Sequence, residues 1–147
     1  MTRKQKTVSK ILELKEIKKE QLQTEVGKAQ ERLNAEQAKV DVLEETYKDT
    51  HAAIMLKQMK GTVPAHEVDL CYAYLNHLSV MIEQQMRIVA TRAAELEQLR
   101  KAMVEAYKEQ HLIEILHDKI ALEQIKEADH IEQRESDYSF ISRKIEK

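Results

Sequence analysis

Lys60-Gly61-Thr62-Val63-Pro64 is the stretch that decides the fold. It holds the only proline and one of the two glycines in the 147 residues. Glycine takes the left-handed conformation that ends many helices, and proline suits the first turn of a new helix but not a helix interior. Thr62 is the expected N-cap of the second helix. We therefore expect a helical hairpin, and the alternative is a linker between two independent helices.

The composition argues against a thick globular core. Charged residues make up 34% of the chain, tryptophan is absent and Phe140 is the single phenylalanine. The one cysteine, Cys71, excludes an intramolecular disulfide, which is typical of a reducing compartment. The basic start lacks the apolar run of a signal peptide, and no stretch approaches the roughly 20 apolar residues of a membrane span. We expect a cytoplasmic protein made of long, solvated helices.

The apolar residues before the turn recur in alternating steps of three and four, which predicts a coiled-coil seam. The a positions are Leu12, Val26, Leu33, Val40, Tyr47 and Ile54. The d positions are Val8, Leu22, Ala29 and Leu43. Polar residues are expected to interrupt the seam at Lys15, Lys19, Glu36, Thr50 and Lys57. Their aliphatic stems can lie along the seam while the charge stays in water, at a cost in packing.

Ile11, Leu14 and Ile17 depart from this phase, because they are apolar but do not lie at seam positions. Two interpretations remain open. The heptad phase slips here by a stutter, or these residues form a second apolar stripe for a partner.

The residues after the turn carry the matching half of the seam. One row steps by seven through Val68, Leu75, Ile82, Val89, Leu96 and Met103. The row between them contains Cys71, Leu78, Leu99, Ala106, Ile113 and Ile120. Gln85 and Arg92 interrupt this pattern, and the neighbouring Met86 and Ala93 are expected to take over their places.

An uneven hairpin follows from the position of the turn. With the reversal near residue 62, residue i lies opposite roughly residue 124 − i, and about 53 residue pairs span about 80 Å. We expect one coiled-coil domain over 1–147, with helix one at about 7–59, the turn at 60–64 and helix two at about 65–140. Residues 118–147 then lack a partner helix, although an apolar side continues through them. The fold class is an all-α, antiparallel two-helix coiled-coil hairpin, in which the longer second helix overhangs the N-terminus.

The residues give little support to catalysis. Glu114 with His117 and Glu127 with His130 repeat a spacing found in di-iron carboxylate bundles, but both pairs lie on one helix about 20 Å apart. Two isolated glycines cannot form a phosphate-binding loop. We expect no enzyme activity, catalytic residue, metal or cofactor. The net charge of −2 gives no general attraction to nucleic acid.

The tyrosines near the turn favour a binding surface. Tyr47, Tyr72 and Tyr74 approach one another in the expected register, and His51 falls in the same region. Exposed tyrosine is enriched at binding hot spots. The alternative is that these rings only cover a thin seam.

The chain resembles the FliJ/YscO family, the stalk proteins of type III export apparatus. The resemblance covers nearly the whole chain and depends on four stretches within a long polar coiled coil. These are Val8-Ser9-Lys10-Ile11-Leu12-Glu13-Leu14-Lys15-Glu16, Met59-Lys60-Gly61-Thr62, Ala73-Tyr74-Leu75 and Glu127-Ala128-Asp129-His130-Ile131-Glu132-Gln133-Arg134-Glu135-Ser136-Asp137. The motifs leave open whether the system is flagellar or an injectisome.

The resemblance implies a non-enzymatic stalk that inserts into the ring of a hexameric export ATPase, promotes its activity and links it to the export gate. The implied partners are that ATPase, the cytoplasmic domain of an export-gate membrane protein, and export chaperones. The implied location is cytoplasmic, peripheral to the inner-membrane export apparatus, without direct membrane insertion. The alternative is a tethering coiled coil that oligomerises through its C-terminal helix.

Two sets of residues are the candidate partner-binding sites. The gate or chaperone set is Tyr47, His51, Tyr72, Tyr74, Leu75 and Leu78. The ATPase-ring set is Ile11, Leu14, Ile17, Ile125, Ile131, Tyr138 and Ile141.

Overall fold

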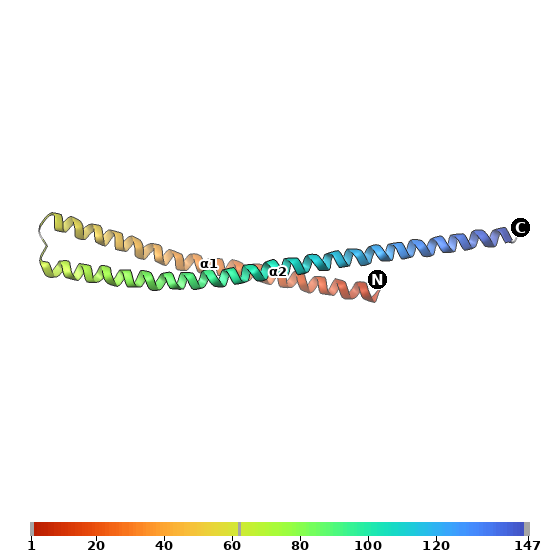
Figure 1. Cartoon of the computed structure of the whole chain (residues 1–147), viewed down its shortest axis with the longest axis horizontal. Helices are drawn as coiled ribbons and strands as arrows, with labels where there is room; N and C mark the ends of the chain where they lie inside the picture. The colour runs from red at the N-terminus through yellow and green to blue at the C-terminus, as the bar shows by residue number, and fades with distance from the viewer. Residues whose placement is uncertain (1, 62, 146–147) are drawn as a thin grey trace. The chain divides into compact units, whose positions relative to one another are not determined.

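The computed structural model describes residues 2–61 and 63–145. Helix α1 runs over Arg3–Met59 and helix α2 over Ala65–Ile145, with no strand among the described residues. The two helices pack against each other as a hairpin, and the chain reverses between them (Figure 1). The predicted fold class, an all-α two-helix hairpin, is confirmed.

The turn is built as the glycine and proline positions predicted. The last helical carbonyls are used by the amides of Lys60 and Gly61, which donate to Leu56 and Gln58 at 3.3 and 3.1 Å. Gly61 has a φ of 67°, in the left-handed region that ends helices. The carbonyl of Pro64 then accepts hydrogen bonds from the amides of Glu67 and Val68 in the first turn of α2, so proline stands where its missing N–H costs nothing. Thr62, the expected N-cap, lies outside the described residues.

Helix α1 begins at Arg3, one turn before the expected start near residue 7. The amide of Gln5 donates to Thr2 Oγ1, and the amide of Thr2 donates to Gln5 Oε1, both at 3.3 Å. This reciprocal pair is a capping box, which satisfies two amides that a helix start leaves without partners. The signal was present in the sequence as Thr2-Arg3-Lys4-Gln5.

Two compact units make up the chain, and each is described separately. The terminal unit consists of Met1–Gln21 and Met103–Lys147, and the turn unit consists of Leu22–Ala102. Within the turn unit the buried apolar residues are Ala29, Val40, Ile54, Leu75, Leu78 and Leu96. Within the terminal unit they are Val8, Ala106 and Ile120. All of these are residues that the heptad pattern placed in the seam.

The seam keeps its phase through the start of α1. Lys15 and Lys19 are half-buried in the seam, whereas Leu14 and Ile17 are 65% and 50% exposed. Lys15 Nζ pairs with Glu109 Oε2 at 2.8 Å, and residue 109 is the partner that the expected register assigns to Lys15. The stutter is therefore excluded for this segment, and the second apolar stripe is present. Lys57 is exposed, so it does not belong to the seam.

The expectation for Gln85 and Arg92 was wrong. Both stay half-buried in the seam, whereas Met86 is 47% exposed and Ala93 is exposed. Gln85 Nε2 donates to the carboxylate of Glu36 and, at 3.1 Å, to the Glu36 carbonyl. Gln85 remains in the seam because Glu36 faces it, and the hydrogen bonds between them offset the cost of burying polar groups.

Candidate partner-binding surfaces

The gate or chaperone candidates lie in the turn unit and divide between surface and core. Tyr72 and Tyr74 are 45% and 46% exposed. Tyr47 is half-buried and its ring stacks on exposed His51, with centroids 6.4 Å apart and an interplanar angle of 8°. These four residues can offer aromatic contact area to a partner.

Leu75 and Leu78 do not belong to an accessible surface. They are 4% and 3% exposed, so the side chains pack in the seam rather than facing solvent. A partner would have to open the hairpin to reach them. Their seam positions in the heptad pattern already implied this burial, and we leave both leucines out of the proposed contact surface.

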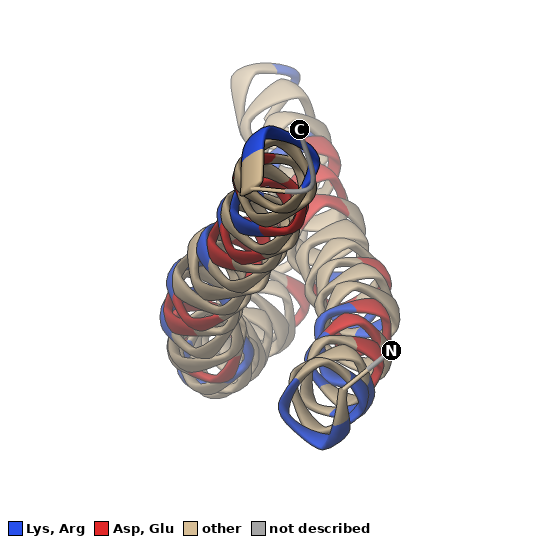
Figure 2. Ribbon diagram, turned by 90° about the vertical axis from the view of Figure 1, so that its right-hand side faces the viewer, with Lys and Arg blue, Asp and Glu red and all other residues tan. Residues whose placement is uncertain are grey.

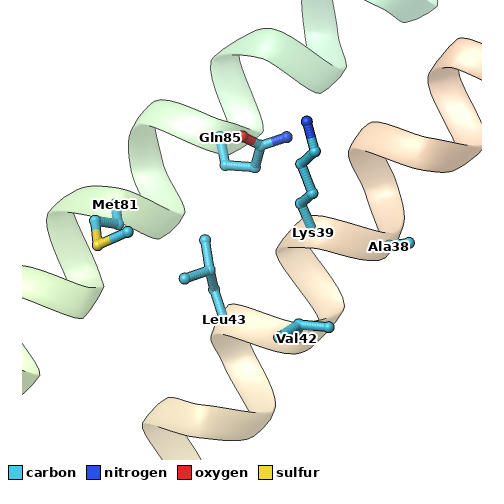
Figure 3. Close-up of a pocket in the computed structure, with 6 residues that line it drawn as sticks. All are labelled: Ala38, Lys39, Val42, Leu43, Met81 and Gln85. Atoms are coloured by element: carbon cyan, nitrogen blue, oxygen red, sulfur yellow. The ribbon is translucent and has the colours of Figure 1, made fainter.

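A shallow groove in the turn unit was not anticipated. It has a volume of about 460 Å³ and is lined by Ala38, Lys39, Val42, Leu43, Met81 and Gln85. Figure 3 shows Leu43 and Met81 contributed by opposite helices, with Gln85 and Lys39 at the other end. The sequence signal was the polar break at Gln85, beside which apolar side chains are left partly uncovered.

Two hydrogen-bonded acidic residues mark polar layers in the seam. In the turn unit, the hydrogen bond from Gln85, followed by that from Lys39, lowers the pKa of Glu36 below its ordinary value of 4.5. In the terminal unit, the hydrogen bond and charge of Lys15, with Lys18 behind it, lower the pKa of Glu109 below 4.5. Both carboxylates are therefore stabilised in their charged form.

We predict that the Glu109 layer contributes to stability only above acidic pH. The pKa of Glu109 is lower folded than unfolded, so its contribution is complete above 4.5 and is lost as the pH falls through the lower, folded-state pKa. Replacing Glu109 with Gln should lower the urea midpoint at neutral pH, and the difference from wild type should vanish in acid. Circular dichroism at several pH values measures this. Glu123→Gln, which changes an exposed carboxylate on the same helix, is the control, and a pH-independent difference for Glu109→Gln would contradict the prediction.

A buried polar residue, Gln110, lies beside the ion pair of Lys15 and Glu109. It is 6% exposed and donates to Glu114 Oε1 at 3.2 Å and to Glu16 Oε1 at 3.5 Å. Position 110 continues the row that steps by seven after Met103, so periodicity could have found it. Lys19 Nζ lies 5.4 Å from the centre of the Tyr107 ring in the same region, which adds a cation–π contact.

The ATPase-ring candidates all lie in the terminal unit, and all are exposed. Ile11, Leu14 and Ile17 lie on the side of α1 that faces away from the seam. On α2 the exposed fractions of Ile125, Ile131, Tyr138 and Ile141 range from 50% to 74%. Figure 1 shows α2 continuing past the start of α1 within this unit. These side chains follow Gln124, whose Nε2 donates to Thr2 Oγ1 at 2.6 Å just before α1 begins.

A further exposed apolar stripe on α2 was missed. Its members, which lie three, four and ten residues after the first and so share one side of the helix, are Leu112, Ile115, Leu116 and Leu122. In sequence they alternate with the seam residues Ile113 and Ile120. The apolar residues of this region therefore belong to two faces of the helix, one in the seam and one exposed. The heptad pattern identifies only the residues of the seam, so it does not identify this exposed face.

The Glu–His pairs do not assemble a metal site among the described residues. Glu114 is engaged by Gln110 and lies 3.8 Å from His111 Nδ1. His117 Nδ1 lies 3.5 Å from Asp118, while His130 is exposed on the tail of α2. In the part of the chain that the structure describes, neither helix has an apolar stretch sufficient to cross a membrane.

These features define the class of protein as a two-helix hairpin with apolar side chains left exposed on its outer faces. The chain belongs to the flagellar FliJ family, because the family model for the flagellar FliJ protein matches residues 5–142. The family consists of non-enzymatic components of flagellar export, and the chain is a coiled-coil protein related to that process. No curated protein and no solved structure compared with the chain matches it.

Proposed function

We propose that the chain is the central stalk of the flagellar export ATPase, inserting into the hexameric ring, promoting its activity and linking it to the export gate. In this proposal it works in the cytoplasm beside the inner-membrane export apparatus. The observation that carries the proposal is the exposed apolar side chains on the outer faces of both helices in the terminal unit.

A ring surrounds a rod and contacts it from several sides, so its binding residues cannot be confined to one groove. Leu14 and Ile17 face outward from α1, while Ile131 and Tyr138 are exposed on the tail of α2. Acidic and basic residues are interspersed between them along both helices (Figure 2). Apolar side chains separated by charges of both signs suit a helix pair that a ring holds without locking it in one orientation.

The turn unit supplies a separate surface for the gate protein or an export chaperone. Tyr72 and Tyr74 are exposed, and His51 with Tyr47 adds a stacked pair. None of these side chains belongs to the terminal unit. A stalk can then use residues of one unit to bind the ATPase and residues of the other unit to bind a second partner.

Hydrolysis by the cognate hexameric ATPase, measured with and without the full chain, tests the stalk proposal. We expect the chain to bind the ATPase and to raise the rate of hydrolysis at saturation. Absence of both binding and stimulation would count against the proposal.

For the turn unit, we predict that Tyr72→Ala with Tyr74→Ala weakens binding to the gate protein about tenfold or more, because exposed tyrosines are frequent hot spots. Helicity should persist because both side chains are exposed. A titration against the cytoplasmic domain of the gate protein measures the affinity. The control, Leu70→Ala with Val80→Ala, removes similarly exposed apolar side chains. Unchanged affinity in the tyrosine variant would remove this surface from the proposal, and a chaperone titration would then be the next test.

A tethering coiled coil is the second candidate, and the tail of α2 is the observation that favours it. Ile131, Tyr138 and Ile145 are each separated by seven residues and are exposed. A second helix could cover such a row. Sedimentation of the full chain and of a chain ending at Lys119 separates the candidates. A stable dimer lost on truncation favours tethering, and a monomer favours the stalk.

A further inference from the structure

The start of α1 carries a group of basic residues on the side away from the seam. Arg3, Lys6, Lys10 and Lys18 are all exposed. Among the described residues, the ion pairs include one of these cations, Lys18, whose Nζ lies 4.0 Å from Glu109. Figure 2 shows the basic start of the helix beside the label N. The local charge is therefore strongly positive although the whole chain has a net charge of −2.

Aliphatic side chains share this side of the helix. Arg3, Lys10, Leu14 and Ile17 are separated by seven, four and three residues, which places them in one row at 3.6 residues per turn. Thr7, Ile11, Leu14 and Lys18 form the adjacent row. We call these residues together the outer α1 face: Arg3, Thr7, Lys10, Ile11, Leu14, Ile17 and Lys18.

The opposite side of the same segment is occupied by the hairpin. Val8 is 6% exposed, and Lys15 and Lys19 are held by Glu109 and Tyr107 of α2. The capping box of Thr2 and Gln5 fixes the first turn as a helix. The outer α1 face is thus already ordered, and a ligand does not have to supply the free energy of forming the helix.

We propose that the outer α1 face binds an anionic membrane surface, with the helix lying along the surface and not crossing it. Basic residues close to such a surface are attracted to anionic lipid headgroups, and aliphatic residues beside them reach the boundary of the acyl chains. Neither the electrostatic nor the apolar attraction alone holds a segment this short on a membrane, but here both act on one face. The proposal goes beyond the stalk function, and because Leu14 and Ile17 are also candidate ring contacts, lipid and ring would occupy this face in turn.

The residue types on this face favour lipid over an acidic protein. The face contains three branched aliphatic residues and no aromatic ring, whereas protein hot spots are enriched in Trp, Tyr and Arg. Of the acidic residues in the segment, Glu16 accepts a hydrogen bond from Gln110. Glu13 lines a hollow together with Arg3, Lys6 and Lys10, where the basic residues outnumber it. A broad, negatively charged surface needs no pocket, and the hollow is lined mainly by polar side chains.

Cosedimentation of the full chain with lipid vesicles tests the proposal without any ATPase. We expect binding to vesicles that contain about a third phosphatidylglycerol, little binding to pure phosphatidylcholine, and release by salt as the charges are screened. Arg3→Glu with Lys10→Glu should lower the partition coefficient about thirtyfold or more. Leu14→Gln with Ile17→Gln should also lower the partition coefficient. Less of this variant is then bound to the vesicles, so less can be released by salt.

Lys28→Glu with Lys48→Glu is the matched control, because it makes the same charge change on exposed positions of α1 in the turn unit. This control should retain wild-type binding. No binding to anionic vesicles at low salt, equal binding to neutral vesicles, or an equal loss in the control would each overturn the proposal. If vesicles do not bind but Arg3→Glu with Lys10→Glu abolishes stimulation of the ATPase, the face binds an acidic protein surface instead. Loss of stimulation therefore reports on the stalk, and loss of vesicle binding reports on this inference.

Discussion

Replacing Leu78 with Ala is expected to lower the free energy of unfolding by about 2 to 4 kcal/mol, the usual cost of removing a buried leucine side chain. Leu78 is 3% exposed in the seam of the turn unit. A two-helix seam is thin, so no second layer of side chains is available to fill the space that the substitution leaves. Urea denaturation followed by circular dichroism measures the change.

The control for this experiment is Met86→Ala, eight residues further along the same helix. Met86 is 47% exposed, so its truncation should change the free energy of unfolding by no more than about 0.5 kcal/mol. The pair tests the phase of the seam directly. Similar losses in the free energy of unfolding for the two variants would show that Met86, and not Gln85, lies in the seam.

The second large effect is expected in the tail of α2. Replacing Ile131, Tyr138 and Ile141 with Gln should abolish stimulation of the export ATPase, if the terminal unit is the part that enters the ring. Each side chain is at least half exposed, and hot-spot truncations cost roughly 2 kcal/mol each in binding. Glutamine preserves helix propensity, so the helix itself should persist. Steady-state hydrolysis at increasing concentrations of the variant measures the loss.

A matched variant distinguishes loss of a binding surface from a general loss of apolar area. Leu70, Val80 and Ile88 are 67%, 50% and 43% exposed in the turn unit, and their replacement with Gln removes a similar amount of apolar surface. Stimulation should survive in this variant. If the two triple variants behave alike, the tail is not the contact with the ring.

Most of the fold could be predicted because a coiled coil repeats one local rule. The steps of three and four placed Val8, Val40 and Leu96 in the seam, and the single glycine–proline turn fixed the register closely enough to predict the pairing of Lys15 with residue 109. The errors arose where a polar residue belongs to the seam. Hydrophobicity alone favours Met86 over Gln85, and the hydrogen-bond partner of Gln85, Glu36, lies 49 positions away in sequence.

The candidate surfaces were harder to predict, since a binding residue on an exposed helix face has no cleft that identifies it. Tyr72 and Tyr74 are exposed, whereas Leu75 and Leu78, which the sequence groups with them, lie in the seam. The stripe that includes Leu112 and Ile115 was missed because it overlaps the seam in sequence. The exposed fraction of each side chain distinguishes candidate binding residues from seam residues. That fraction depends on which side of a helix the other helix covers.

The conformation of Gly61 makes the reversal of the chain a question of chirality. Its φ is 67°, and a methyl group built on its α-carbon would meet nothing within 4 Å. Space is available, so an L-residue is disfavoured here by its handedness alone. A mirror-image alanine would fit the same turn without strain and would restrict the unfolded chain. The reversal of the chain between the two helices thus depends on Gly61, the one residue of the turn whose α-carbon is not chiral.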